Sequence, residues 1–351
     1  MKANENLHDN NFDLLRLLAA IQVLVLHHLA FFTHSTYSYK TIESIIWNFP
    51  GVNVFFLISG YLIFQSIERN SIATFAIKRI KRIYPALAVC FILTLVLLVS
   101  FNSLNLKEIF SLNFLGWIFA QLTIFQFYNP DLVRDFGFGP PNGALWTISI
   151  EIQFYIFIAG LWYWLLKNKG KRQQNIILVV LFIISATYNC LFHTYLLPDS
   201  LAYKLSFNFI LSYLYFFITG ILVYINKDWF ISKVKGKAFW WLISFIAVCF
   251  LLAHFQIRYQ RYVFNSISFL MLILLTGLVF SIAYTKSSIS RKILVGNDIS
   301  YGIYIYQMPI INLFFHLKYN TSLYSLLLSI AICIIMGILS WVLIEKPMLK
   351  R

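Results

Sequence analysis

The sequence predicts an all-α integral membrane protein, a bundle of about ten transmembrane helices with cytoplasmic N- and C-termini. Its 351 residues are 60% hydrophobic and only 12% charged, about half the charged share of a typical soluble domain. A spanning helix needs about 20 mostly apolar residues, and about ten stretches approach or exceed that length. Lys and Arg also gather on alternate connections, as they do in multi-pass proteins.

The predicted spans are separated by mostly short connections, none large enough to form a soluble domain. Residues 1–351 are therefore predicted to be a single membrane domain. The spans cover residues 12–32, 47–67, 84–101, 145–166, 174–195, 203–225, 237–255, 262–284, 299–317 and 322–343.

One further stretch, 109–128, is apolar enough to cross the membrane. Asn113, Gln121 and Gln126 interrupt it, and counting it as a span would move the basic residues after the next span to the outside. We interpret it as an interfacial or re-entrant helix on the outer side. The following segment, 129–144, is rich in Pro, Gly and Asn and is predicted to be an ordered outer loop.

The net charge of +15 is explained by orientation. With the N-terminus inside, 20 Lys and Arg residues lie in predicted cytoplasmic segments and six in outer segments. This asymmetry predicts that both termini face the cytoplasm. A similar charge in a soluble protein would indicate nucleic acid, but here we expect no nucleic-acid partner. No cleavable signal peptide is predicted, because no small-residue cleavage site follows the first span.

Ionisable residues inside spans are costly and indicate function. The first span contains Asp13, Arg16, His27 and His28. Arg16 and His27 are eleven residues apart, which places them on nearly the same helix face about 16 Å apart along the axis. The alternative is an Arg that snorkels to the interface and a His that is hydrogen-bonded within the bundle.

The fourth span contains a carboxylate, Glu151, among Thr147, Ser149 and Gln153. The predicted topology places Glu151 and His27 at a similar depth in the outer half of the membrane. A His and a Glu at the same depth are the residue types of a general base and the carboxylate that orients it. The alternative is a buried ion pair that only fixes helix packing.

The connection 68–83 carries Lys78, Arg79, Lys81 and Arg82 at spacings that share a helix face. Arg binds phosphate in a bidentate manner, so a phosphorylated cytoplasmic ligand such as coenzyme A would fit. The alternative is topological anchoring with contact to anionic lipid headgroups. The four cysteines lie scattered within spans without metal spacing, and we expect neither a metal nor a permanently bound cofactor.

Six segments, taken in order, resemble motifs of the acyltransferase type 3 family of membrane acyltransferases. The Arg16–His27 helix resembles the family's first helix, and the fourth span resembles its Trp-Ser-Leu-Ser-Val-Glu-Glu-Gln-Phe-Tyr signature. The segments are NFDLLRLLAAIQVLVLHH (11–28), GVNVFFLISGYLI (51–63), Arg79-x-x-Arg82, LWTISIEIQFYI (145–156), ISYGIYIYQMPII (299–311) and Glu345-Lys346-Pro347.

The resemblance implies transfer of an acyl group, usually acetyl, from cytoplasmic acyl-CoA to a carbohydrate hydroxyl at or beyond the outer face. His27 would be the catalytic base or acyl relay, with Glu151 and Arg16 as its catalytic partners. The donor would be bound by Arg79, Arg82 and Lys78. Supporting residues are expected to be Trp146, Ser149, Gln153, Tyr155, Ser59 and Gln307.

Two positions depart from the family pattern, because Ile152 replaces the second glutamate and Gln307 replaces a frequent His. Catalysis would then rest on His27, with His28 as a substitute. The resemblance further implies a location in the bacterial inner membrane. Many family members carry an extra extracytoplasmic hydrolase-like domain, and we expect none in this chain. Expected partners are acyl-CoA as co-substrate, a glycan or lipid-linked sugar as acceptor, and membrane lipids; a homodimer is left open. The alternative functions are a transporter or flippase, or a polymerase, of lipid-linked glycans.

Overall fold

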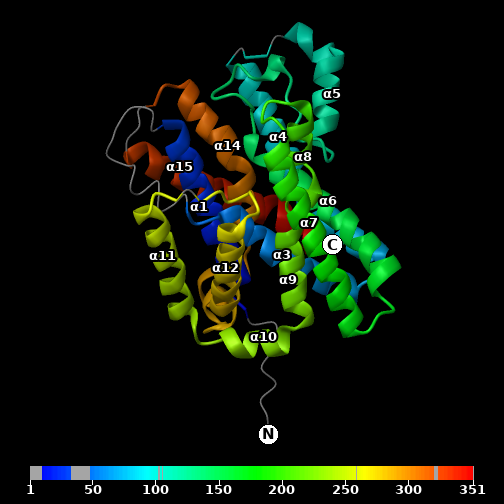
Figure 1. Cartoon of the computed structure of the whole chain (residues 1–351). Coiled ribbons are helices and arrows are strands. Elements are labelled where there is room, and N and C mark those ends of the chain that lie inside the picture. Colours follow the sequence, from blue (N-terminus) through cyan, green and yellow to red (C-terminus); the bar gives the residue numbers. More distant parts are fainter. Residues whose placement is uncertain are drawn as a thin grey trace. The chain divides into compact units, whose positions relative to one another are not determined.

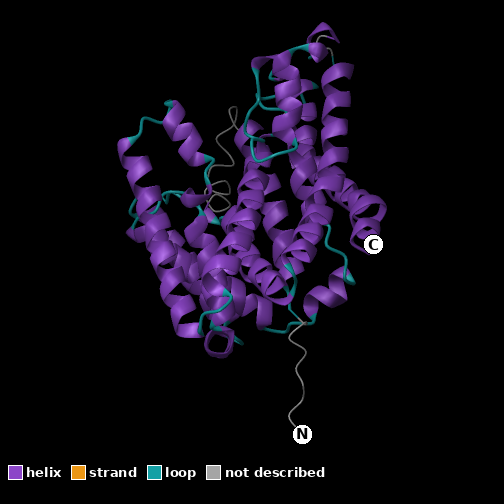
Figure 2. Ribbon diagram, turned by 90° about the vertical axis from the view of Figure 1, so that its right-hand side faces the viewer, coloured by secondary structure: helices purple, strands orange, loops and turns teal. Residues whose placement is uncertain are grey.

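The computed structural model describes residues 10–350 except 33–47, 102, 105, 258 and 320–322. Helices and loops account for all of these residues, with no strand among them (Figures 1 and 2). The chain divides into two compact units. One comprises Met1–Ala19, Pro50–Asn70 and Ile156–Asn297, and the second comprises Ala20–Phe49, Ser71–Tyr155 and Asp298–Arg351.

The first unit is organised around α9 (Leu214–Ile225), which packs against α3 and α7. Its crossing with α3 is very close, because a Cβ atom on Gly60 would lie 2.0 Å from the carbonyl oxygen of Phe217. The Ser-Gly step of the second span therefore permits contact between two helix backbones. The other helices of this unit are α3 (Gly51–Arg69), α7 (Lys171–Tyr195), α8 (Leu201–Phe207), α10 (Lys227–Val234), α11 (Ala238–His254), α12 (Ser266–Tyr284) and α13 (Ile289–Leu294).

The second unit is organised around α14 (Ser300–His316), which is buried along nearly its whole length. It packs against α15 where Gly302 meets Gly337, and it also contacts α4. Polar side chains on α14 therefore face other helices and require partners there. The other helices of this unit are α4 (Ile72–Ser100), α5 (Leu112–Gln121), α15 (Leu323–Ser340) and α16 (Lys346–Lys350), with a π-turn at Trp341–Glu345. Two helices, α1 (Phe12–Phe32) and α6 (Trp146–Leu161), contribute residues to both units.

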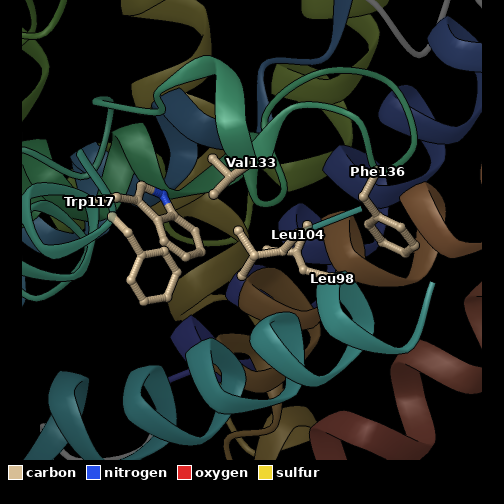
Figure 3. Packing of buried hydrophobic residues seen from close by; sticks show 6 residues of the cluster. Leu98, Leu104, Trp117, Val133 and Phe136 are labelled. Carbon is tan, nitrogen blue, oxygen red and sulfur yellow. The ribbon is translucent and has the colours of Figure 1, made fainter. Parts of the chain in front are cut away.

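The segment between α4 and α6 forms a small hydrophobic core with the end of α4 (Figure 3). Within it, α5 has ten residues and a length of about 15 Å, half the hydrocarbon thickness of a bilayer. Its depth in the membrane stays a prediction. The loop 129–144 is fastened to α14 by Asn312, whose amide donates to the carbonyls of Pro140 and Pro141. The core consists of Leu98, Leu104, Phe114, Trp117, Val133 and Phe136.

Seven helices among the described residues are long and apolar enough to cross a membrane, or eight if the bent pair α9–α10 is one span. The helices α11 and α14 are slightly shorter, at 17 residues each, and the predicted count of about ten spans is not confirmed. One predicted span, 203–225, is wrong as a continuous helix. It is divided into α8, a 3-10 turn and α9, because the carbonyls of Leu211 and Ser212 are bonded by side chains of α7.

The basic residues of the predicted connection 68–83 are also placed differently, because they belong to a helix. Ser71 caps α4 by accepting a hydrogen bond from the backbone of Thr74, so the helix begins twelve residues before the predicted start at 84. Hydropathy marks only the part of α4 that is apolar. Residues 47 and 322, at the ends of two predicted spans, and the charged residues Lys2, Lys40, Arg258 and Arg351 lie outside the described residues.

Candidate functional site

His27 lies on α1 and faces the buried helix α14. Its Nδ1 is 3.3 Å from Oε1 of Gln307, and the ring is half-buried. The amide of Gln307 is oriented by its own Nε2, which donates to the carbonyl of Tyr304 at 2.9 Å. Oε1 accepts a hydrogen bond from Nδ1 in the tautomer of His27 that carries its proton on that nitrogen. In the neutral imidazole the lone pair is then on Nε2, the nitrogen that acts as a base.

His28 is held in a different environment. Its ring is 2% exposed, and its two nitrogens lie 3.3 Å from the hydroxyl of Ser325 and 2.9 Å from that of Ser329 on α15. Both nitrogens therefore have partners within the bundle. The two adjacent histidines therefore lie against different helices: His28 joins α1 to α15, and His27 faces Gln307 on α14.

The fourth predicted span forms α6, and its polar residues fall on two stripes. Thr147, Glu151 and Tyr155 follow one another at intervals of four residues. The hydroxyl of Tyr155 donates to Glu151 at 2.5 Å, and Thr147 is 2.6 Å from the hydroxyl of Tyr304. This stripe therefore faces α14.

The second stripe consists of Ser149 and Gln153, which also share one face of α6. Ser149 is fully buried and donates to the carbonyl of Ile124 in the segment after α5. Gln153 donates to Ser149 at 3.4 Å. These two side chains hold the segment after α5 against α6. Trp146, the first residue of α6, is half-buried.

Glu151 and His27 are offset along α14. Thr147, on the same stripe as Glu151, contacts Tyr304, and Glu151 lies one turn further along α6, whereas His27 contacts Gln307. The role of Glu151 as the orienting partner of His27 stays a prediction.

Arg82 lies in a buried ion network within the second unit. Its Nη2 is 2.5 Å from Asp298 and its Nη1 is 3.0 Å from Glu345, and the side chain is only 13% exposed. Its guanidinium also lies over the rings of Tyr301 and Trp341, at 5.6 and 5.9 Å. This arginine joins α4, the start of α14 and the turn that follows α15.

The acidic partners of Arg82 are themselves satisfied. Ser340 donates to Oε1 of Glu345 at 2.9 Å, and Ser300 donates to Oδ1 of Asp298 at 2.5 Å through its hydroxyl. A fully connected buried network of this kind fixes the positions of its members. Arg82 was predicted to bind the donor. That role stays a prediction, and the contacts of its guanidinium among the described residues are with two carboxylates and two aromatic rings.

Arg79, one turn earlier on α4, is placed differently. Its guanidinium is stacked between the rings of Phe75 and Tyr155, 5.7 Å from each centroid. Its buried Nε has no hydrogen-bond partner among the described residues. The neighbouring Lys78 is exposed. Because the ring of Tyr155 contacts Arg79 and its hydroxyl binds Glu151, this cation is linked to the polar stripe of α6.

Two further predicted residues, Arg16 and Ser59, belong to the first unit, and their relation to His27 stays a prediction. Sequence analysis assigned no role to Asp298, Glu345, Thr147 and Tyr304. Glu345 and Asp298 lie 263 and 216 residues from Arg82, so no local pattern pairs them. Among the described residues no group of three or more His, Cys, Asp or Glu side chains is placed to hold a metal.

Comparison with known proteins gives one family. Residues 9–345 match the family described as the acyltransferase domain. The chain is 30% identical to nodulation protein 10 of Rhizobium leguminosarum bv. viciae, over 98% of this chain and 94% of that protein. It is 30% identical to an O-acetyl transferase of Shigella phage Sf6, over 98% of both chains. A peptidoglycan O-acetyltransferase, OatA of Listeria monocytogenes, is 27% identical over 86% of this chain and 51% of that protein. No solved structure matches.

Proposed function

This chain belongs to the acyltransferase-domain family, and from that premise we propose that it transfers an acetyl group from cytoplasmic acetyl-CoA to a hydroxyl of a surface polysaccharide or lipid-linked sugar. Membrane O-acyltransferase activity is supported by its O-acetyltransferase relatives. One of them acts on peptidoglycan, according to its name, which favours a carbohydrate acceptor. The observation that carries the proposal is the 3.3 Å contact between Nδ1 of His27 and Oε1 of Gln307, which favours the tautomer with a basic Nε2.

The tautomer of His27 suits general base catalysis. With Nδ1–H donated to Gln307, Nε2 can accept the proton of a sugar hydroxyl as its oxygen attacks the thioester carbonyl. The C–S bond then breaks, and the imidazolium returns the proton to the coenzyme A thiolate. An uncharged amide partner orients the ring without adding a charge to it. In the alternative, Nε2 accepts the acyl group and passes it to the sugar.

The donor is assigned to Arg79 in preference to Arg82. Arg79 has no carboxylate partner among the described residues and lies beside the exposed Lys78 on α4. Arg82, in contrast, is engaged by two carboxylates, and phosphate binding would require it to leave them. We therefore expect Arg79, with Lys78, to contact the phosphates of coenzyme A, and Arg82 to hold α4 in place. Both residues lie on the side that the charge pattern predicts to be cytoplasmic.

Purified protein in lipid nanodiscs should bind acetyl-CoA and release coenzyme A when an acceptor glycan is added. Arg79→Ala should weaken acetyl-CoA binding at least tenfold, because one charge-assisted contact is worth about 1.5–3 kcal/mol. Lys169→Ala, which removes an exposed lysine of the first unit, is the matched control. If Arg79→Ala leaves the affinity for acetyl-CoA unchanged, Arg79 does not bind the donor and serves as a topological anchor. A transporter or polymerase would release no coenzyme A.

The acceptor and the acyl group are identified separately. Surface glycans of a strain that lacks the gene should lose a substituent with the mass of an acetyl group. Loss of a succinyl substituent would identify the donor as succinyl-CoA, and the reaction would still be acyl transfer. Glycans that are unchanged in mass would contradict the proposed acceptor.

A further inference from the structure

A groove of about 620 Å³ lies on the first unit, between α7, α9, α10 and α12. Its volume is within the ~300–1,000 Å³ of sites that hold small molecules. Its walls are mostly aliphatic and aromatic. The side chains that line its length include Val179, Phe182, Leu222, Phe269 and Ile273.

One end of this groove is polar and adjoins a basic depression. A neighbouring depression on α7 shares Asn175 and Val179 with the groove, and it is bordered by Lys171 and Arg172. At the same end the amides of Asn175 and Asn226 bind each other reciprocally, at 3.2 and 2.9 Å. The groove and the adjoining depression together therefore offer an apolar length and a cationic end, which matches the charge distribution of an anionic amphiphile.

The orientation of α10 indicates how the groove lies in a bilayer. This helix is turned by 95° from α9 and runs across its end (Figure 1). It presents Trp229, which is 64% exposed, as tryptophans of membrane interfaces do. Asn226 joins α9 to α10, so the polar end is at the interface. The apolar length extends beside α7 and α12, which are both apolar enough to span a membrane.

We propose that this groove binds a phospholipid with an anionic headgroup. The phosphate contacts Lys171 and Arg172, and one acyl chain lies along Val179 and Phe269. Lipid chains cover any apolar groove that faces the hydrocarbon, so the selective element is the basic pair. Basic residues at a membrane surface attract anionic lipids and discriminate against zwitterionic ones. This site is independent of the acyl transfer proposed above.

Native mass spectrometry of the purified full-length protein with added lipids tests this proposal. We expect one molecule of dioleoyl phosphatidylglycerol to bind at least about tenfold more tightly than dioleoyl phosphatidylcholine. Lys171→Ala/Arg172→Ala should remove this preference, whereas Arg291→Ala/Lys292→Ala, an exposed basic pair that does not line the groove, should retain it. Ile273→Trp, which fills the groove, should weaken binding of both lipids. Val179→Phe is the substitute if that variant does not fold.

Competition experiments distinguish the ligand classes. Inorganic phosphate should not displace phosphatidylglycerol, because it has no chain to occupy the groove. Displacement by phosphate alone would reduce the site to an anion site and overturn the proposal. Displacement by acetyl-CoA would identify the groove with the donor site and would also overturn it. Equal binding of the two lipids, or an unchanged preference after Lys171→Ala/Arg172→Ala, would leave the basic pair as a topological anchor.

Discussion

Replacing Arg82 with alanine removes the cation from a network that contains two buried carboxylates. Glu345 is 1% exposed and the side chain of Asp298 is 11% exposed, so neither can recover its lost interaction from bulk water. Removing one partner of a buried ion pair costs about 3–5 kcal/mol. We expect Arg82→Ala to lower the free energy of unfolding by about that amount. Arg79→Ala should change it little, because Arg79 lies over aromatic rings without a carboxylate partner among the described residues.

Equilibrium unfolding of the purified protein in detergent, followed by tryptophan fluorescence, measures this difference. The penalty arises from uncompensated charge, so Arg82→Ala/Asp298→Asn/Glu345→Gln should recover much of the stability that Arg82→Ala loses. The reasoning is refuted if Arg82→Ala has the same free energy of unfolding as the wild type. It is also refuted if the triple variant is no more stable than Arg82→Ala, because the cost would then come from lost packing.

Three other predictions test the topology, the helix packing and the polar stripe of α6. Lys171 and Lys235 should react with reagents only from the cytoplasmic side, and labelling of Lys171 from outside intact cells would mean that 109–128 spans the membrane. Gly60→Ala should lower the free energy of unfolding by about 1–3 kcal/mol, since its Cβ would meet a backbone carbonyl. Gly170→Ala is the control, because its Cβ would have no neighbouring atom within 4 Å. If Gly60→Ala is as stable as the wild type, the close crossing of α3 and α9 is excluded. Glu151→Gln should reduce the rate of acyl transfer more than the stability, because its amide oxygen can still accept from Tyr155; an unchanged rate would make this contact structural.

The all-helical fold and most of the long helices could be predicted from hydropathy, because burial in lipid requires long apolar stretches. The start of α4 was predicted wrongly because its first three turns are rich in Lys and Arg. Lys78 to Arg82 were interpreted as a connection, yet helices continue beyond the hydrocarbon whenever a cap such as Ser71 and tertiary partners stabilise them. The division of 203–225 into α8, a 3-10 turn and α9 could not be predicted from the sequence either. Side chains of Ser185 and Asn189 on α7 bind carbonyls between α8 and α9, and apolar periodicity does not register such contacts.

In the candidate site, too, local sequence patterns predict the face of a helix on which a residue lies but not its partners far away in the sequence. Helix periodicity distinguishes His27 from His28, and the structure places them against different helices. The partner of His27 could not be derived from periodicity, because Gln307 lies 280 residues away. The same holds for Arg82, whose carboxylates lie more than 200 residues away. A positive cluster predicts anion binding equally for each of its members, and only the fold shows which arginine is already paired.

The most direct test compares His27→Ala with His28→Ala for acetyl transfer from labelled acetyl-CoA by the purified protein. His27→Ala should retain its fold and lose activity by about 10²–10⁴-fold, as expected for a missing general base. His28→Ala should remain catalytically competent but lose about 1–3 kcal/mol of stability, because the hydroxyls of Ser325 and Ser329 lose their imidazole partner. Full activity of folded His27→Ala, or loss of chemistry in folded His28→Ala, would contradict the assignment of His27 as the catalytic residue.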